Sequence, residues 1–304
     1  MIQIVGRYAP SPTGPLHFGS LIAALASFCH ARSQGGRWLL RIDDLDAPRV
    51  VPGADRAIID TLAAFGLTHD GPILYQSQRH AAYAATVARL RNASLAFDCA
   101  CSRREAQSGP AGLEGPIYPG TCRDGIPEGR CARSVRLRAD AGVVAVADRI
   151  QGRYAQNLAA DIGDFVIRRA DGVAAYQLAT VLDDAEQGIT EVIRGADLLS
   201  STPRQIWIHR CLDLCPPAYG HIPVIVDAAG EKLGKSTGAL ALDSVRPQEQ
   251  LVQCLSLLGQ GPPAALAARS VGGVIDWAVD HWDADRVPRR RTCRRANAAT
   301  AAGN

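Results

Sequence analysis

The first 42 residues alternate between short apolar runs and one long run with helical spacing, which restricts the fold more than any other feature. The run IQIVGRYA is apolar and β-prone, and the turn cluster PSPTGP follows it. LHFGSLIAALASFCHARSQ then carries apolar residues at helical spacing up to Gly35 and Gly36, after which RWLLRI forms a second β-prone run. Strand–helix–strand order predicts an α/β fold with an open, mainly parallel sheet.

The alternation continues along most of the chain. Helices are expected over residues 52–66 and 77–95, in AAYQLATVLDDAEQG and in STPRQIWIHRCLDL, with strands in SVRLRA, VVAVADRI, DFVIRR and ITEVIRG. The segment from Cys99 to about Arg133 is rich in Gly, Pro, Cys and Arg and lacks periodicity, so we expect an insertion that is not held by a hydrophobic core. We therefore expect a catalytic domain over 1–240 with an insertion at about 97–135, a short helical region over 241–285, and a disordered Arg/Ala-rich tail over 286–304.

Composition excludes several classes of protein. Hydrophobic residues make up 47% of the chain, and the net charge of +3 is too small to indicate a nucleic-acid partner by itself. No apolar run approaches the roughly 18 residues of a membrane span, and the N-terminus lacks a charged-then-apolar leader. We expect a cytoplasmic protein without a membrane partner. In that compartment, nine cysteines indicate metal binding or burial rather than a disulfide scaffold.

The loop EKLGKSTG holds Lys232 and Lys235, which are the only lysines among 33 lysine and arginine residues. Lysine is a compact point charge on a flexible stem, suited to one phosphate oxygen in a tight space, whereas arginine is a planar fork. The loop therefore predicts a phosphate contact, although chance remains an alternative. A P-loop is a weak alternative, because Ala229 stands where G-x-x-x-x-G-K-[ST] requires its first glycine.

A second phosphate site is suggested by RYAPSPTGPLHFGS, where a turn leads into a helix that begins near His17. Helix N-termini bind phosphate through free N–H groups and the helix dipole. Gly19 would let a flat base approach the backbone, and His17 could donate to a phosphate oxygen. An ordinary strand–helix turn with an incidental histidine is the alternative.

HFGS and KLGKS together resemble the paired HIGH and KMSKS signatures of class I aminoacyl-tRNA synthetases. Around them, RYAPSPTG, RIDDLD, YQSQR and DFVIRRADGVAAYQLATVLDDAEQGITEVIRGADLLSSTPRQ resemble the glutamyl-tRNA synthetase group, from about residue 4 to 240. About 65 residues follow the KLGKS loop, which is thin for an anticodon-binding domain. The chain thus resembles the truncated glutamyl-Q tRNA(Asp) synthetase family, which implies a Rossmann-type class I catalytic domain.

Members of that family activate L-glutamate with ATP without needing tRNA, and attach it to the queuosine base of tRNA(Asp). The resemblance implies the same activity and partners here. A short tRNA-charging glutamyl-tRNA synthetase is one alternative. A zinc-stabilised RNA-binding protein without catalysis is another, and the intact HFGS and KLGKS loops argue against it.

The resemblance also implies site residues. His17 and Lys235 would be catalytic, because the transition state gathers negative charge on phosphoryl oxygens. Ser20 stands where HIGH has its second histidine, a departure that the family shares. Mg²⁺ is expected with ATP, without a protein ligand that can be named. The ATP site would comprise His17, Gly19, Ser20, Lys232, Lys235 and Ser236.

Glutamate has two carboxylates and one ammonium, so its pocket needs about two cations and one anion. Arg7 and Arg194 would bind the carboxylates, and Asp43 the ammonium, at a position where the family usually has Glu. The shorter side chain calls for a water bridge or a small backbone shift. The pocket implied by the resemblance comprises Arg7, Tyr8, Ala9, Pro10, Ser11, Asp43, Tyr176 and Arg194.

The family holds one structural zinc ion with a Cys-x-Cys pair, a Tyr, and a Cys four residues after the Tyr. This chain matches with Cys99, Cys101, Tyr118 and Cys122. Cys131 competes with Tyr118 for the fourth position, because thiolate is the better zinc ligand. A second group, His209, Cys211 and Cys215, is better explained as buried side chains.

Overall fold

The computed structural model describes residues 3–140, 142–227, 230, 242 and 245–294. Most elements follow the sequence-based expectation. Lys232, Lys235 and Ser236 lie outside the described residues, so the structure leaves their predicted phosphate contacts as predictions.

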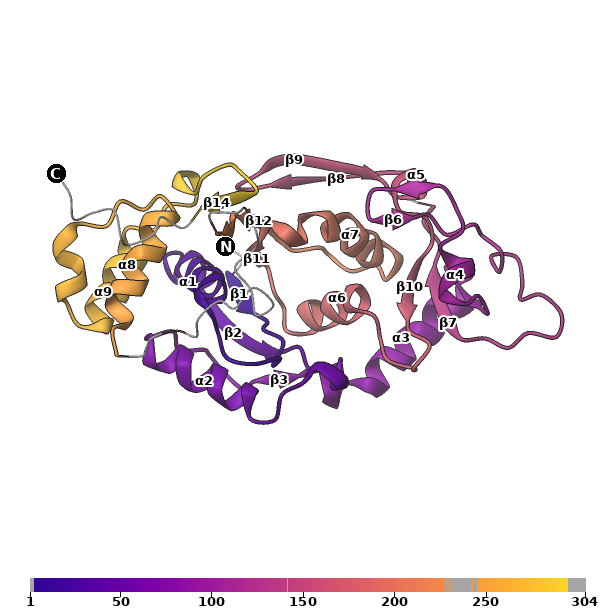
Figure 1. Cartoon of the computed structure of the whole chain (residues 1–304), viewed down its shortest axis with the longest axis horizontal. Helices are drawn as coiled ribbons and strands as arrows, with labels where there is room; N and C mark the ends of the chain where they lie inside the picture. Colours follow the sequence, from indigo (N-terminus) through magenta and orange to yellow (C-terminus); the bar gives the residue numbers. More distant parts are fainter. Residues whose placement is uncertain (1–2, 141, 228–229, 231–241, 243–244, 295–304) are drawn as a thin grey trace.

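Two parallel ladders form the central sheet (Figure 1). One joins β1 (Val5–Tyr8), β2 (Arg37–Ile42) and β3 (Leu74–Tyr75) in the order β1-β2-β3, and the other joins β11 (Glu191–Gly195) to β12 (Ala218–Ile222). The ladders meet where the Thr190 amide donates to the Val5 carbonyl at 2.9 Å and the Val5 amide donates to Thr190 Oγ1 at 2.9 Å. The spatial order β3-β2-β1-β11-β12 places a change of winding direction between β1 and β11.

Helix α1 (Phe18–Arg32) covers this sheet and is buried along most of its length. It packs closely because its inner face is rich in alanine and because β1 offers Gly6, where an added Cβ would lie 3.1 Å from the Ala31 Cβ. Trp38 of β2 is fully buried and packs edge-on against Phe28 at 5.2 Å between ring centroids. A rigid α1 fixes its own N-terminus at the carboxyl end of β1.

Further elements lie to one side of the central sheet (Figure 1). Helices α6 (Tyr176–Glu186) and α7 (Thr202–Cys211) pack on each other, and α3 (His80–Asn92) packs on α6 and β4. Helix α2 (Ala54–Ala64) buries Ile58 and Leu62 in the core that α1 shares with the central sheet. An antiparallel sheet has the order β10-β7-β4, and a hairpin pairs β8 with β9. Their bounds are β4 (Ala96–Cys99), β7 (Ser134–Leu137), β8 (Val143–Asp148), β9 (Gly152–Asn157) and β10 (Phe165–Arg168).

The insertion after β4 carries little regular structure, as its composition predicts. Its elements, including one turn of helix, are α4 (Arg103–Ala106), β5 (Ala111–Gly112) and β6 (Gly115–Pro116), and the short helix α5 (Leu158–Asp161) follows β9. Short 3-10 turns are η1 (Ala47–Arg49), η2 (Gln76–Gln78) and η3 (Ala196–Ser201).

The C-terminal region is helical, as expected, with α8 (Pro247–Leu257), η5 (Ala264–Ala268), α9 (Val271–Asp280) and η6 (Ala284–Arg286). The expectation of disorder from residue 286 onward is wrong for residues 286–294. Strand β14 (Thr292–Arg294) pairs in parallel with β13 (Val224–Val226), and the side chains of Val287 and Cys293 are buried. The composition of this segment does not reveal these tertiary contacts, because its arginines stay exposed while Val287 and Cys293 are buried. Among the described residues, no helix has the length and apolar character needed to cross a membrane.

Candidate active site and cysteine cluster

A cavity of about 200 Å³ opens between the start of α1 and the carboxyl ends of β11 and β12. His17 and Gly19, at the start of α1, line one side, and Gly195 and Asp197, which follow β11, line the other. Open α/β sheets bind ligands at such a topological switch point. The fold therefore brings the predicted HFGS turn to the carboxyl edge of the central sheet, beside this cavity.

His17 is the N-cap residue of α1. Its Nδ1 accepts a hydrogen bond from the Ser20 amide at 3.3 Å, so the neutral ring carries its proton on Nε2. The first turn of α1 contains no acidic residue that would oppose an anion. His17, Gly19 and Ser20 thus lie together at a helix N-terminus suited to phosphate.

Arg194 of β11 is buried and held by four acceptors, one of which is the Leu198 carbonyl at 3.4 Å. Its Nε donates to His221 Nε2 at 2.9 Å, and its Nη2 donates to Thr202 Oγ1 at 2.9 Å and to Gln205 Oε1 at 2.8 Å. Its Nη1 is buried without a hydrogen-bond partner among the described residues. A buried donor left open on a fixed guanidinium matches a carboxylate ligand.

His221 of β12 is oriented by Asp148 at the end of β8, and both side chains are fully buried. The Asp148 Oδ2 lies 2.5 Å from His221 Nδ1, while Asp148 Oδ1 accepts from three backbone amides at 2.8–3.1 Å. Burial lowers the pKa of His221 to about 4, so the ring is neutral at pH 7. The proton therefore sits on Nδ1, and Nε2 stays an acceptor for Arg194.

Predicted glutamate-site residue Arg7 belongs to a buried ion-pair network. Its guanidinium donates to both carboxylate oxygens of Asp184, at 3.2 and 3.3 Å. Arg41, with no exposed surface, donates to Asp184 Oδ1 at 2.5 Å and to Asp43 Oδ1 at 2.7 Å. Burial opposes ionisation of Asp184, but Arg7 and Arg41 hold its pKa at about 2. The charge of Arg7 is thus neutralised by Asp184. Within this network, Arg41 Nη2 is a buried donor without a hydrogen-bond partner among the described residues.

The remaining predicted pocket residues lie on β1, on the loop that follows it and at the start of α6. The Asp43 amide donates to the Pro10 carbonyl at 3.0 Å, which joins the loop after β2 to the loop after β1. Tyr8 ends β1, Ala9 and Ser11 lie in the loop that follows it, and Tyr176 begins α6 with 39% of its surface exposed. Burial raises the pKa of Tyr219, and the nearby charges of Arg194 and Arg7 oppose this rise.

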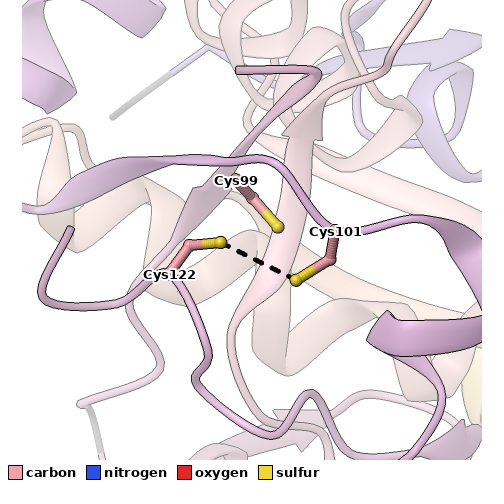
Figure 2. Close-up of side chains that lie close together, drawn as sticks. All are labelled: Cys99, Cys101 and Cys122. Carbon is pink, nitrogen blue, oxygen red and sulfur yellow. Dashed lines mark hydrogen bonds between the residues drawn. The ribbon is translucent and has the colours of Figure 1, made fainter. Parts of the chain in front are cut away.

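Three cysteines gather in the insertion (Figure 2). The sulfurs of Cys99, Cys101 and Cys122 all lie within 4.8 Å of one another, and the three side chains are buried. The Tyr118 hydroxyl is 3.4 Å from Cys99 Sγ and 3.5 Å from Cys101 Sγ, and it accepts from the Cys122 amide at 2.9 Å. Cys131 is exposed and stands outside the cluster. The structure therefore favours Tyr118 over Cys131 as the fourth group.

Arg136 adds a positive charge to this cluster. Its Nε donates to Cys99 Sγ at 3.4 Å, and its guanidinium carbon lies 3.9 Å from the centre of the Tyr118 ring. Burial raises the pKa of Cys99, but hydrogen bonds from Tyr118 and Arg136 bring it down to about 7. Among the described residues, His209, Cys211 and Cys215 do not form a metal-binding cluster. Cys211 is half-buried and Cys215 is exposed, so the expectation that both cysteines are buried holds only in part for Cys211 and not for Cys215.

Comparison with known proteins agrees with this geometry. The family model for the catalytic domain of class I tRNA synthetases (E and Q) matches residues 3–268. A glutamyl-Q tRNA(Asp) synthetase of Dechloromonas aromatica is 57% identical, over 94% of this chain and 96% of its own length. The chain belongs to the glutamyl-Q tRNA(Asp) synthetase family. Further proteins of that name, from Chromobacterium violaceum and Pseudomonas aeruginosa, are 52% and 50% identical over 93% and 95% of this chain, and over 95% and 96% of their own lengths.

Solved structures show the same fold. A glutamate tRNA ligase from Elizabethkingia meningosepticum, in complex with its amino acid, superposes with a TM-score of 0.80 at 23% identity, over 96% of this chain and 67% of that one. The glutamate-tRNA synthetase of Elizabethkingia anophelis gives 0.81 at 23% identity, over 97% and 68%. Like its relatives in the glutamyl-Q tRNA(Asp) synthetase family, the chain is a ligase of the aminoacyl-tRNA synthetase type with an α/β class I fold.

Several residues of the site escape sequence reasoning. Arg41 carried a signal, because a charge inside the apolar run RWLLRI predicts a buried ion pair. The sequence signal for Asp184 was weaker: Asp184 is one of two adjacent aspartates in the predicted helix that becomes α6. Asp148 and His221 offered none, since they are 73 residues apart and meet only through the packing of β8 on β12.

Proposed function

We propose that this protein activates L-glutamate with ATP, without tRNA, and transfers the glutamate to the queuosine base in the anticodon of tRNA(Asp). The observation that carries the proposal is the pairing of two binding features at one switch point. The open Nη1 donor of buried Arg194 supports carboxylate binding, and the α1 N-terminus at His17 supports phosphate binding. The names of relatives that are 50–57% identical specify the amino acid and the tRNA.

The first step joins the glutamate α-carboxylate to the ATP α-phosphorus. A carboxylate oxygen forms the new P–O bond, the bond to the β-phosphate bridging oxygen breaks, and pyrophosphate leaves with the electron pair. Negative charge grows on the phosphoryl oxygens, so cations and N–H donors accelerate the step more than a nucleophilic side chain would. His17 donates to the α-phosphate region, and Lys235, with Lys232, meets the departing pyrophosphate. Mg²⁺ accompanies ATP.

Glutamate recognition uses the buried network. Arg194 holds one carboxylate through its Nη1, and Arg41 Nη2 and Gln205 Nε2 are further buried donors without a partner among the described residues. Asp43 faces the ammonium, although it already accepts from Arg41 at 2.7 Å. Arg7 acts chiefly by holding Asp184 ionised and in place. In the second step a queuosine hydroxyl attacks the activated carbonyl, and AMP leaves.

The cysteine cluster supports one structural zinc ion held by Cys99, Cys101, Tyr118 and Cys122. A tetrahedral site with Zn–S of about 2.3 Å and Zn–O of about 2.0 Å requires S···S edges of about 3.8 Å and S···O edges of about 3.5 Å. The Cys101–Cys122 separation is 3.7 Å, and the two Tyr118 separations are 3.4 and 3.5 Å. The donor set thus fits zinc, which would fasten an insertion that lacks a large core.

The proposed organisation is a catalytic domain over residues 1–240 interrupted by this insertion, followed by a helical region over 241–285. ATP and tRNA as substrates support a cytoplasmic location. A short tRNA-charging glutamyl-tRNA synthetase is the second candidate, because the solved neighbours of this fold are glutamate tRNA ligases.

Glutamate-dependent ATP–pyrophosphate exchange, measured with and without tRNA, tests the proposal. We expect full exchange without tRNA. Exchange that requires tRNA(Glu) would favour the charging enzyme. No exchange under either condition would favour a protein that binds RNA without catalysis.

A further inference from the structure

A second cavity, of about 540 Å³, lies between the insertion and the catalytic body. Its volume falls inside the range of about 300–1,000 Å³ that is typical of small-ligand sites. Cys101 and Tyr118 of the cysteine cluster form one end, and Val166 and Ala170, near β10, form part of the other. Its charged lining residues are four arginines and two carboxylates: Arg103, Arg136, Arg169, Arg204, Glu114 and Asp164.

The two carboxylates of this cavity are already neutralised. Glu114 pairs with Arg204 at 2.5 Å. Asp164 lies 3.7 Å from Arg123 and accepts from the Ala139 amide at 2.9 Å. Arg169 pairs with Asp171 at 2.7 Å, so the excess positive charge of the wall comes from Arg103 and Arg136, which have no carboxylate partner among the described residues. This excess favours an anionic occupant.

The cavity also offers donors and a flat cationic surface. Arg204 Nε is buried and has no hydrogen-bond partner in the part of the chain that the structure describes. Arg136 is held in one orientation by the Asp164 carbonyl at 2.9 Å and by its contact with the Tyr118 ring. Guanidinium planes and aromatic rings are the surfaces on which splayed RNA bases stack.

The inner wall of the cavity connects with the glutamate pocket through two contacts. Arg204 Nη2 lies 3.4 Å from Ser201 Oγ, which accepts from Gln177 Nε2 at 3.0 Å, and Gln177 follows Tyr176. Arg169 pairs with Asp46 at 3.6 Å, in the loop that begins with Asp43. These two contacts join the wall of the cavity to the segments that carry Tyr176 and Asp43 of the predicted glutamate pocket.

We propose that this cavity binds one nucleotide of the RNA acceptor, the neighbour of the modified nucleotide, with its phosphate against Arg103 and Arg169 and its base against Arg136. The proposal rests on the proposed function, which supplies an RNA substrate. It adds the location of a second, sequence-tolerant contact that would hold the acceptor nucleotide out of its stack.

The test combines transfer with direct binding. Arg103→Gln/Arg169→Gln removes two charges from the cavity, and Gln107→Trp reduces its volume without changing charge. Arg56→Gln/Arg286→Gln is the matched control, since these side chains are 79% and 59% exposed and pair with carboxylates elsewhere. Labelled-glutamate transfer to a queuosine-containing anticodon stem-loop is measured relative to pyrophosphate exchange, and binding of a fluorescent stem-loop is measured by anisotropy.

We expect the cavity double variant to weaken stem-loop binding about tenfold or more, because hydrogen bonds to charged groups are involved. The slope of log K against log salt should fall by roughly 0.7 for each lost phosphate contact. The ratio of transfer to exchange should fall in parallel, and Gln107→Trp should also weaken binding. The control should match the unmodified protein in all assays.

Stem-loop binding within twofold of the control would overturn the proposal, as would a rise in the KM for ATP in place of a loss of RNA binding. Failure of the proposed function has a different signature. In that case the unmodified protein transfers no glutamate to the stem-loop. The cavity proposal is then tested by anisotropy alone, as the binding of fluorescent tRNA(Glu) to the cavity variants and to the control variant.

Discussion

Asp148→Asn tests how Arg194 is held ready for glutamate. The Asn oxygen can replace Asp148 Oδ1 and keep the three backbone hydrogen bonds. The Asn NH₂ group then faces His221 Nδ1, where the Asp148 Oδ2 lies at 2.5 Å in the unmodified protein. Nδ1 must become an acceptor, so the ring proton moves to Nε2 and confronts the Arg194 N–H that is 2.9 Å away.

The expected loss is one hydrogen bond to a charged group, about 1.5–3 kcal/mol. If that loss falls on the glutamate-bound state, the KM for glutamate rises about tenfold to a hundredfold, with the KM for ATP unchanged. Asp148 touches neither proposed substrate, so this selective change would mark it as a positioning residue. Pyrophosphate exchange at varied glutamate and varied ATP gives both constants.

Two-bond proton–nitrogen NMR spectra identify which nitrogen of His221 carries the proton, and they should report a change from Nδ1 to Nε2. Asp60→Asn is the matched control, because Asp60 is exposed and pairs with Arg56 on α2. If the NMR spectra show the altered tautomer while the KM for glutamate stays within twofold of the control, the reasoning about Arg194 is refuted.

Three further outcomes are expected. Cys122→Ser should lose the bound zinc on metal analysis, and Cys131→Ser should keep it; equal retention in both would contradict the proposed ligands. Lys235→Arg should lose most adenylate formation while glutamate still binds by calorimetry, because it keeps the charge but not the point-donor geometry; near-normal exchange would oppose this. Burial lowers the pKa of His209 and His221 to about 4, so the unfolded chain takes up protons first as pH falls below about 6.5. The free energy of unfolding should therefore fall between about pH 6.5 and 4, by at most about 1.4 kcal/mol per pH unit for each histidine, and urea titrations of His209→Gln should show a shallower dependence.

Local patterns predicted most elements of this fold because each element carries its own periodicity. The strand over residues 143–148 alternates exposed and buried side chains along its whole length, and α1 presents apolar residues at helical spacing. Which strands pair with each other was harder to predict from the sequence. Composition pointed to a solvated tail after residue 286, whereas β14 pairs with β13 and buries Cys293, which depends on an edge supplied by a distant strand.

The site divides in the same way. The role of His17 could be predicted locally, because the sequence places it at the start of a helix that follows a strand, and it is the N-cap residue of α1. Arg7 and Arg194 came from family resemblance, and their different environments, one paired with Asp184 and one left with an open donor, depend on contacts across the fold. The supporting contact between Asp148 and His221 could not be predicted, because no local pattern specifies which buried carboxylate meets which buried imidazole.

The most direct test of the central claim is transfer of labelled glutamate to an isolated tRNA(Asp) anticodon stem-loop, with and without queuosine. Such a stem-loop lacks the acceptor end, so any label it gains marks the anticodon. The account predicts that the queuosine-containing stem-loop is labelled and that the unmodified one is not. An unlabelled queuosine stem-loop, together with charging of whole tRNA(Glu), would contradict it.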